Sequence, residues 1–246
     1  MSEVLPPPCR DRFPELEKSF LSFVNPTDTI GRVYSAAGPH PVRWNTFRTY
    51  GPSDSRFDHH PAPAGNHPRR GIAYGVSRPE DPNEEMLLVC LLERFQRTRV
   101  VDRWFDRPHF ATYRPRRQLC LLNVGSRWAT RAGCNGAISS GPHEMARRWS
   151  RAIYLHYRGD RAKYVDDDGR TRPVRLDGLL YRCSLWQERN AIALYERAAD
   201  ALPAAPLLDA PLGDSQFDEF MDDVDQVGLR LVVPGIGALP VPPSRA

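Results

Sequence analysis

Apolar residues recur along the chain with two different periods, which together predict a mixture of strands and helices. Residues 29–35 (TIGRVYS) and 71–76 (GIAYGV) alternate in the manner of half-buried strands. Residues 84–96 (EEMLLVCLLERFQ) form the clearest helical pattern, with acidic residues at the start and arginine near the end, where the helix dipole favours each charge. A second helix is expected over residues 142–157.

The weaker patterns complete the predicted fold. Ser139 or Ser140 is expected to cap the second helix, because a serine hydroxyl can accept a hydrogen bond from the first turn. Residues 105–116 predict a charged, aromatic loop, and residues 190–198 fit either a strand or a helix. Short strands are expected in residues 98–104, 117–124 and 228–233. Because strands and helices do not alternate regularly, the sequence predicts an α+β fold with small twisted sheets and flanking helices.

Proline-rich segments divide the chain into three parts. Residues 1–26 are expected to form an N-terminal helical extension, with an amphipathic helix over residues 13–24 (FPELEKSFLSFV). Residues 27–200 are expected to form a single domain, in which residues 36–70 are dense in proline, glycine and histidine and predict a long loop. Residues 201–246 are expected to form a C-terminal appendage rich in proline and alanine.

The basic residues are almost all arginine. Of the 34 basic residues in this chain of 246, only Lys18 and Lys163 are lysines, and the other 32 are arginines. Arginine binds phosphate and carboxylate groups bidentately, but a GC-rich coding sequence would favour arginine as well. The net charge is only +4, because acidic residues are spread among the basic ones. The composition therefore does not predict a nucleic-acid surface.

No segment predicts export or membrane insertion. The N-terminus lacks a basic start followed by an apolar run, and no apolar run approaches the roughly 20 residues of a membrane helix. We therefore expect a cytoplasmic protein without a membrane partner. The five cysteines are odd in number and include no C-x-x-C pair, so reduced thiols are expected rather than disulfides or a zinc site.

Common motifs of nucleotide-binding and hydrolytic enzymes are missing from the sequence. It contains no G-x-G-x-x-G, G-x-x-x-x-G-K-[ST], G-x-S-x-G or H-E-x-x-H. Asp58, His59, His60 and His67 carry metal-ligating groups, but their spacing fits no helix face and predicts a solvated loop. Residues 166–169 (DDDG) resemble the start of a calcium loop without its downstream glutamate, so a turn is expected and no metal ion.

A few singular residues stand on the predicted strands, turns and helix, namely Arg32, Arg56, Tyr74, Glu93 and Ser184. Each alone has a structural explanation, as an exposed charge, a core aromatic residue or an acid on a helix surface. Glu93 fits such an explanation least, because the preceding residues of its helix (LLVCLL) are apolar on every side. We therefore expect Glu93 to face a partly buried cleft.

Taken in chain order, these segments resemble the RES domain, a family named for an arginine, a glutamate and a serine, over roughly residues 24–199. Arg32 in RVY and Arg56 in SRF resemble the two arginines of the family, and Tyr74 in IAYG resembles its Tyr-Leu-Ala strand. Glu93 in LLERFQRTRVVDR resembles the glutamate of its helix. Two later segments are also similar to the family, residues 138–154 and 177–198.

Two positions depart from the family pattern. Glu84 or Glu85 would fit the usual spacing from the tyrosine better, but only the residues after Glu93 match the family. Within the segment that resembles Tyr-x-Ser, Cys183 occupies the serine position, and Ser184 follows one residue later. A thiol is a weaker hydrogen-bond donor than a hydroxyl, so this exchange would cost roughly 1–3 kcal/mol of ligand contact.

The resemblance implies both an activity and a fold. RES-domain proteins are toxins of bacterial toxin–antitoxin pairs that cleave the nicotinamide–ribose bond of NAD, with water or phosphate as the acceptor, and their fold resembles that of ADP-ribosyltransferases. NAD would then be the substrate rather than a cofactor, and a helix-turn-helix antitoxin would be a partner. The implied catalytic residues are Glu93 and Arg32, and the implied substrate-binding residues are Arg56, Tyr74, Cys183 and Ser184.

The residues leave two other functions open. With cysteine at the serine position, the domain could have lost catalysis and could act as a regulatory module that contacts nucleic acid or an acidic protein. Steeply salt-dependent binding of nucleic acid, without any loss of NAD, would favour that alternative. An enzyme that acts on another nucleotide is the third hypothesis, and thermal shifts with NAD, NADP and ADP-ribose would separate it from the first.

Overall fold

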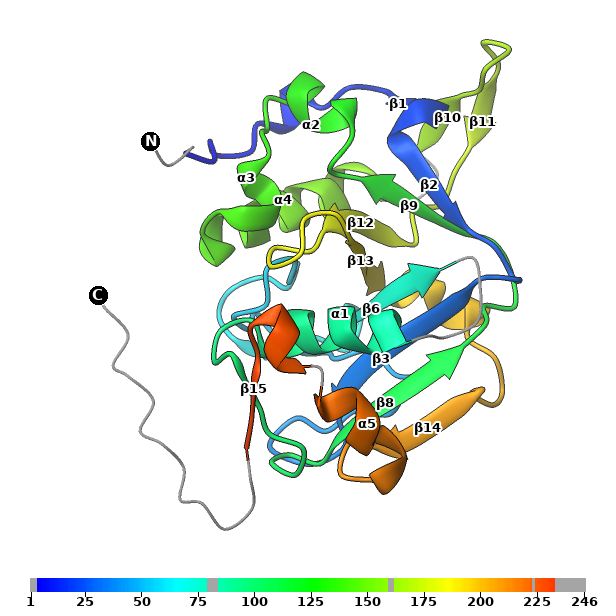
Figure 1. The fold of residues 1–246 in the computed structure, drawn as a ribbon. Helices are drawn as coiled ribbons and strands as arrows, with labels where there is room; N and C mark the ends of the chain where they lie inside the picture. The colour runs from blue at the N-terminus through cyan, green and yellow to red at the C-terminus, as the bar shows by residue number, and fades with distance from the viewer. Residues whose placement is uncertain (1–3, 79–83, 159–161, 223, 233–246) are drawn as a thin grey trace.

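An eight-stranded sheet runs through the middle of the molecule (Figure 1). The computed structural model describes residues 4–78, 84–158, 162–222 and 224–232. In sheet order, the strands are β14 (Leu208–Pro211), β8 (Pro108–Tyr113), β3 (Thr29–Ser35), β6 (Ile72–Arg78), β13 (Asn190–Tyr195), β12 (Gly178–Arg182), β9 (Leu119–Asn123) and β2 (Leu21–Val24). Neighbouring strands are antiparallel except β12 and β9, which are parallel. The central strand β13 is apolar without alternation, because both of its faces are covered.

Helices pack on both halves of the sheet. They are α1 (Glu84–Phe95), α2 (Arg127–Arg131), α3 (Ala137–Ser140), α4 (His143–His156) and α5 (Asp218–Asp222). Helix α1 shares a hydrophobic cluster with the C-terminal segment, whereas α2, α3 and α4 pack around Trp128 and Trp149 on the half that contains β9 and β12 (Figure 1). The fold is α+β, as the sequence predicts. None of the described helices has the length and apolar character needed to cross a membrane.

Shorter elements complete the fold. A small sheet contains β1 (Leu16–Glu17), β10 (Lys163–Val165) and β11 (Thr171–Pro173), and two strand pairs join β4 (Tyr50–Gly51) to β5 (Gly65–Asn66) and β7 (Val100–Val101) to β15 (Arg230–Leu231). The short 3-10 helices are η1 (Arg10–Arg12), η2 (Lys18–Phe20), η4 (Glu196–Ala201), η5 (Ser215–Phe217) and η6 (Val224–Val227). Residues 166–169 form the expected turn, which joins β10 to β11.

The predicted N-terminal helix over residues 13–24 is wrong. This segment forms β1, η2 and β2, and β2 pairs with β9 at the edge of the main sheet. Leu16 and Phe20 are buried in the same cluster as α4. A helix of three turns has little stability on its own. At the edge of the sheet, the same residues gain backbone hydrogen bonds and bury their apolar side chains, so tertiary pairing decides the conformation. The segment is therefore part of the domain and not a helical extension.

Other expectations about local structure also need correction. Residues 108–113, expected within a loop, form β8, because β3 and β14 pair with its two edges. Ser139 and Ser140 lie in α3 and do not cap α4, whose N-cap is Pro142. Proline disfavours a helical conformation at the preceding residue, so the longer helix begins only after it. The ambiguous residues 190–198 form β13 and the start of η4.

The C-terminal part of the chain is more than a loose appendage. Strand β14 extends the main sheet beside β8. Phe217, Met221 and Val224 are buried in the cluster that contains α1. The described residues after position 201 therefore help to hold α1 in place. The proline-rich end, residues 233–246, lies outside the described residues.

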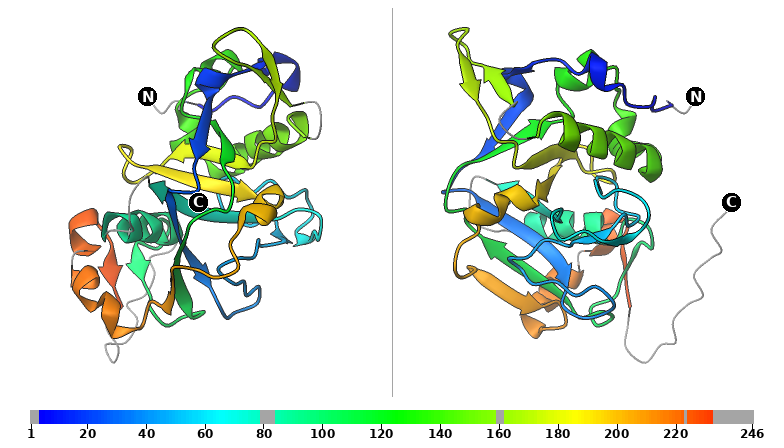
Figure 2. Two further views of the ribbon diagram at one scale, coloured as in Figure 1. Left: turned by 90° about the vertical axis from the view of Figure 1, so that its right-hand side faces the viewer. Right: turned by 180° about the vertical axis from the view of Figure 1, so that it is seen from behind.

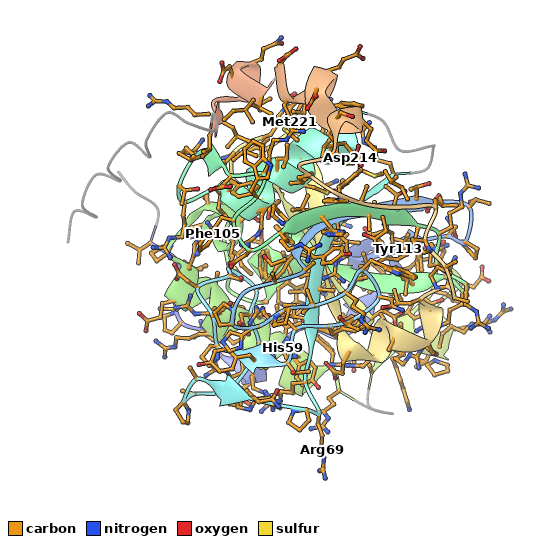
Figure 3. The ribbon with its side chains drawn as sticks, turned by 90° about the horizontal axis from the view of Figure 1, so that it is seen from below. His59, Arg69, Phe105, Tyr113, Asp214 and Met221 are labelled. Carbon is orange, nitrogen blue, oxygen red and sulfur yellow. The ribbon has the colours of Figure 1, made fainter. Side chains whose placement is uncertain are left out.

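The long connection between β3 and β6 contains few strands, as predicted, and stands beside the sheet (blue to cyan in the left panel of Figure 2). Its polar residues are not solvated as expected, because Asp58, His59 and His60 are fully buried. Figure 3 shows His59 inside the molecule, whereas Arg69 of the same connection extends away from it. Among the described residues, no three metal-ligating side chains come together.

Asp58 explains the burial of these polar side chains, because one carboxylate organises the loop. Its Oδ2 accepts hydrogen bonds from Arg48 Nη2 at 2.9 Å and from the Ser53 backbone N–H at 2.6 Å, and its Oδ1 accepts one from the backbone N–H of His60 at 3.0 Å. Burial alone would raise the pKa of Asp58, but the hydrogen bonds of His60 and Ser53 and the charge of Arg48 outweigh it and hold the pKa far below its usual range. The loop therefore folds around an ionised carboxylate.

Candidate active site

A pocket opens where β3 and β6 separate. Among the described residues, the two strands pair only between residues 29–31 and residues 76–78. Beyond Gly31, β3 continues along β8 while β6 continues along β13, so the strands diverge. The gap forms a pocket of about 490 Å³, lined on its two sides by residues 32–35 and 72–76. The divergence of two neighbouring strands thus creates the cavity of the candidate site.

Helix α1 closes one side of this gap because it can approach β3 closely. A Cβ atom on Gly31 would lie 2.5 Å from Sδ of Met86, so a larger residue at this position would force the Met86 side chain to move. The last two turns of α1 then bring Cys90, Glu93 and Arg94 to the pocket. Glu93 thus faces a partly buried cleft, as its apolar surroundings in the sequence indicate.

The four residues Arg32, Arg56, Tyr74 and Glu93, singled out in the sequence, all line this pocket. They come from β3, the long loop, β6 and α1, which are far apart in the chain. Arg48 and Tyr181 also line it and were not singled out. Tyr181 could have been found from the sequence, because it is the tyrosine of the segment that resembles Tyr-x-Ser.

The carboxylate of Glu93 is held from the neighbouring strand. Its Oε2 accepts a hydrogen bond from the Tyr181 hydroxyl at 2.7 Å, and the Cys183 thiol lies within hydrogen-bonding reach. Burial raises the pKa of Glu93 above its usual value, while these two donors and the positive charge of Arg56 oppose that rise. Its ionised form is therefore costly in the free protein and would be favoured by a cation bound nearby.

Replacing Glu93 by Gln is expected to stabilise the fold at neutral and alkaline pH. Because the folded pKa is raised, the wild-type protein loses stability as the pH rises from about 4.5 through the folded pKa, and the Gln variant escapes this loss. Thermal unfolding across pH 4–9 measures the effect as a melting temperature a few degrees higher for the variant, with the difference vanishing near pH 4. A variant that is less stable at every pH would contradict the assigned environment of Glu93.

Two hydrogen-bond donors in the pocket lack a partner. Arg32 is 5% exposed, and its Nη1 donates to the backbone oxygens of Trp44 at 2.9 Å and Thr46 at 3.0 Å. Its Nε and the hydroxyl of Tyr74 are buried and donate no hydrogen bond in the described part of the protein. Buried polar groups are nearly always satisfied in native proteins, so two unsatisfied donors beside one pocket are unusual.

Cys183 and Ser184 lie behind the pocket and do not line it. Cys183 is fully buried beside Glu93, and burial together with that carboxylate raises the pKa of its thiol to about 12. The Ser184 hydroxyl donates instead to Oε1 of Gln96 at 3.0 Å. The thiol of Cys183 contacts the carboxylate of Glu93 directly, whereas Ser184 reaches Glu93 through its backbone N–H.

Comparisons of the chain with models of protein families, with curated proteins and with solved structures find no match.

Proposed function

We propose that this protein cleaves the nicotinamide–ribose bond of NAD, as a glycohydrolase or a phosphorylase of the RES type on a fold like that of ADP-ribosyltransferases. One observation carries the proposal: the side chains of Arg32, Arg56, Tyr74 and Glu93 line a single pocket although they come from four separate segments. These are the residues that resemble the arginines, tyrosine and glutamate of the family. A role as a toxin with a helix-turn-helix antitoxin partner belongs to the same proposal.

The proposed reaction needs a carboxylate and several cations in one place. The bond between the nicotinamide nitrogen and C1′ of the ribose breaks, and its electron pair neutralises the positive charge of the nicotinamide. The ribose then carries an oxocarbenium-like charge, which the Glu93 carboxylate stabilises. An oxygen of water or phosphate forms the new bond to C1′, and with water a proton is released. Arg32 and Arg56 bind the pyrophosphate, and Tyr74 shapes the nicotinamide subsite.

The direct test is incubation of the purified protein with NAD, with and without inorganic phosphate, while free nicotinamide is measured. Release of nicotinamide supports the proposal, and ADP-ribose or its 1-phosphate as the second product identifies the acceptor. If nicotinamide is not released and nucleic acid binds with a steep dependence on salt, the proposal is wrong and the regulatory alternative is favoured.

Replacing Cys183 by Ser is expected to move the acidic limb of the pH–rate profile to lower pH. A hydroxyl donates a stronger hydrogen bond to the carboxylate of Glu93 than a thiol does, which favours the ionised form and lowers its pKa. The profile of nicotinamide release against pH measures the shift. The matched control is Ser184→Ala, which removes the neighbouring hydroxyl but no contact of Glu93, so an equal shift in both variants would argue against a role for Cys183.

A further inference from the structure

A cluster of positive charges surrounds one carboxylate at the opening of the pocket. Asp54 forms ion pairs with Arg97, which follows α1, and with Arg147 of α4, whose Nη1 lies 3.0 Å from Oδ1. His143 stands one helical turn before Arg147, so both face the same loop. Asp54, Arg97 and His143 all line the pocket. Two helices and the loop that carries Arg56 thus meet at this carboxylate.

The cluster has more positive than negative charge even with Asp54 in place. Within the part of the chain that the structure describes, Asp54 is the single acceptor of the Arg97 and Arg147 guanidinium groups. Each guanidinium has five donors in a planar fork that suits the oxygens of a phosphate. The Asp54 carboxylate therefore accepts hydrogen bonds from only a few of these donors. The others have no acceptor among the described residues.

The side chain of Asp54 can leave without disturbing the loop. Its backbone oxygen accepts a hydrogen bond from Nδ1 of His143 at 2.6 Å, which fixes the main chain. The side chain of Asp54 is half exposed and that of Arg97 is largely exposed, so water reaches the ion pair between them. An exposed ion pair such as that with Arg97 is weak, so it separates at small cost. The side chain of Arg147 is only 19% exposed, so most of the cost of moving the carboxylate lies in this second pair, which an incoming phosphate would replace.

We propose that Arg97 and Arg147 form a binding site for a phosphate group, which the carboxylate of Asp54 occupies until a phosphate displaces it. Binding of inorganic phosphate to this site does not depend on the proposed function. The further step, that the group belongs to the NAD pyrophosphate or to the phosphate acceptor, does rest on it.

Titration calorimetry with inorganic phosphate at constant ionic strength tests the site. Because Asp54→Asn removes the competing charge, we expect the variant to bind phosphate about tenfold more tightly than the wild type, and Arg147→Gln to weaken binding by a similar factor. The matched control is Asp106→Asn, which removes a carboxylate from another part of the pocket lining. Less than a threefold change is expected there. Equal tightening in both Asn variants, or no phosphate binding in any variant, would overturn the proposal.

Titrations with ADP and with adenosine identify the source of the phosphate. If the Asp54→Asn variant binds ADP more tightly and adenosine unchanged, the site accepts the phosphates of a nucleotide. If only inorganic phosphate gains affinity, the site serves a free phosphate. Tighter binding of adenosine would contradict a phosphate site. Nicotinamide release by the wild type is a separate measurement, so failure of the phosphate site and failure of NAD cleavage are distinguishable.

Discussion

The Glu93→Gln variant is expected to release nicotinamide from NAD about a thousandfold more slowly than the wild type. The amide keeps the shape of the side chain and can still accept the Tyr181 hydrogen bond, but it carries no charge to stabilise the ribosyl cation. Removing one preorganised electrostatic contact of this kind typically costs 10²–10³ in rate. Initial rates of nicotinamide release measure the loss, and binding of NAD should change far less.

An exposed glutamate provides the control for this experiment. Glu219 lies on the surface of α5, away from the pocket, and Glu219→Gln removes the same charge without touching it. Wild-type rates in the Glu219 variant together with the loss in the Glu93 variant would locate the effect at the pocket. Undiminished turnover in the Glu93 variant would mean that this carboxylate does not act on the ribose.

The Asp58→Asn variant is expected to be about 3 kcal/mol less stable than the wild type. The amide leaves the Arg48 guanidinium and the His60 ring without the charge around which they are arranged, and Asp58 itself is fully buried. For a chain of this size, such a loss corresponds to a melting temperature lower by about 6–12 °C. Thermal unfolding followed by circular dichroism measures it.

The pH dependence of this loss separates charge from packing. Because the folded pKa of Asp58 is depressed, its stabilising effect is present above the unfolded pKa near 3.8 and disappears as the pH falls further. The difference between wild type and variant should therefore shrink below about pH 4. Asp168→Asn, in the exposed turn between β10 and β11, should change stability by less than 0.5 kcal/mol. A similar loss in both variants would show that Asp58 has no special role.

The sequence predicts the central elements well where local pattern and tertiary environment agree. Strand β3, strand β6 and helix α1 lie where the periodicity places them, and they carry Arg32, Tyr74 and Glu93. The sequence predicts a helix for the N-terminal segment because its apolar spacing also suits one, whereas pairing with β9 makes residues 21–24 a strand. The local pattern of apolar residues does not reveal which edge strand of a sheet is free to pair with another segment.

The sequence predicts several residues of the candidate site but not all of them. Arg48 reaches the pocket through a loop that is shaped by Asp58, and His143 reaches it from the first turn of α4. The placement of Arg48 depends on how one irregular loop folds around Asp58, and that of His143 on contact with a segment distant in sequence, neither of which a single-sequence pattern encodes. Cys183 and Ser184 are adjacent in sequence, but the thiol contacts Glu93 and the hydroxyl contacts Gln96. The sequence pattern does not predict this difference.

The short ladder between β3 and β6 has a mechanical consequence. Within the described part of the chain, three residue pairs join β3 to β6 and so connect the two halves of the main sheet. A molecule bound in the gap would contact both halves of the sheet where β3 and β6 do not pair. It would therefore hold the two halves together. Binding of a ligand in the pocket would then make the whole sheet more rigid, including regions that the ligand does not contact.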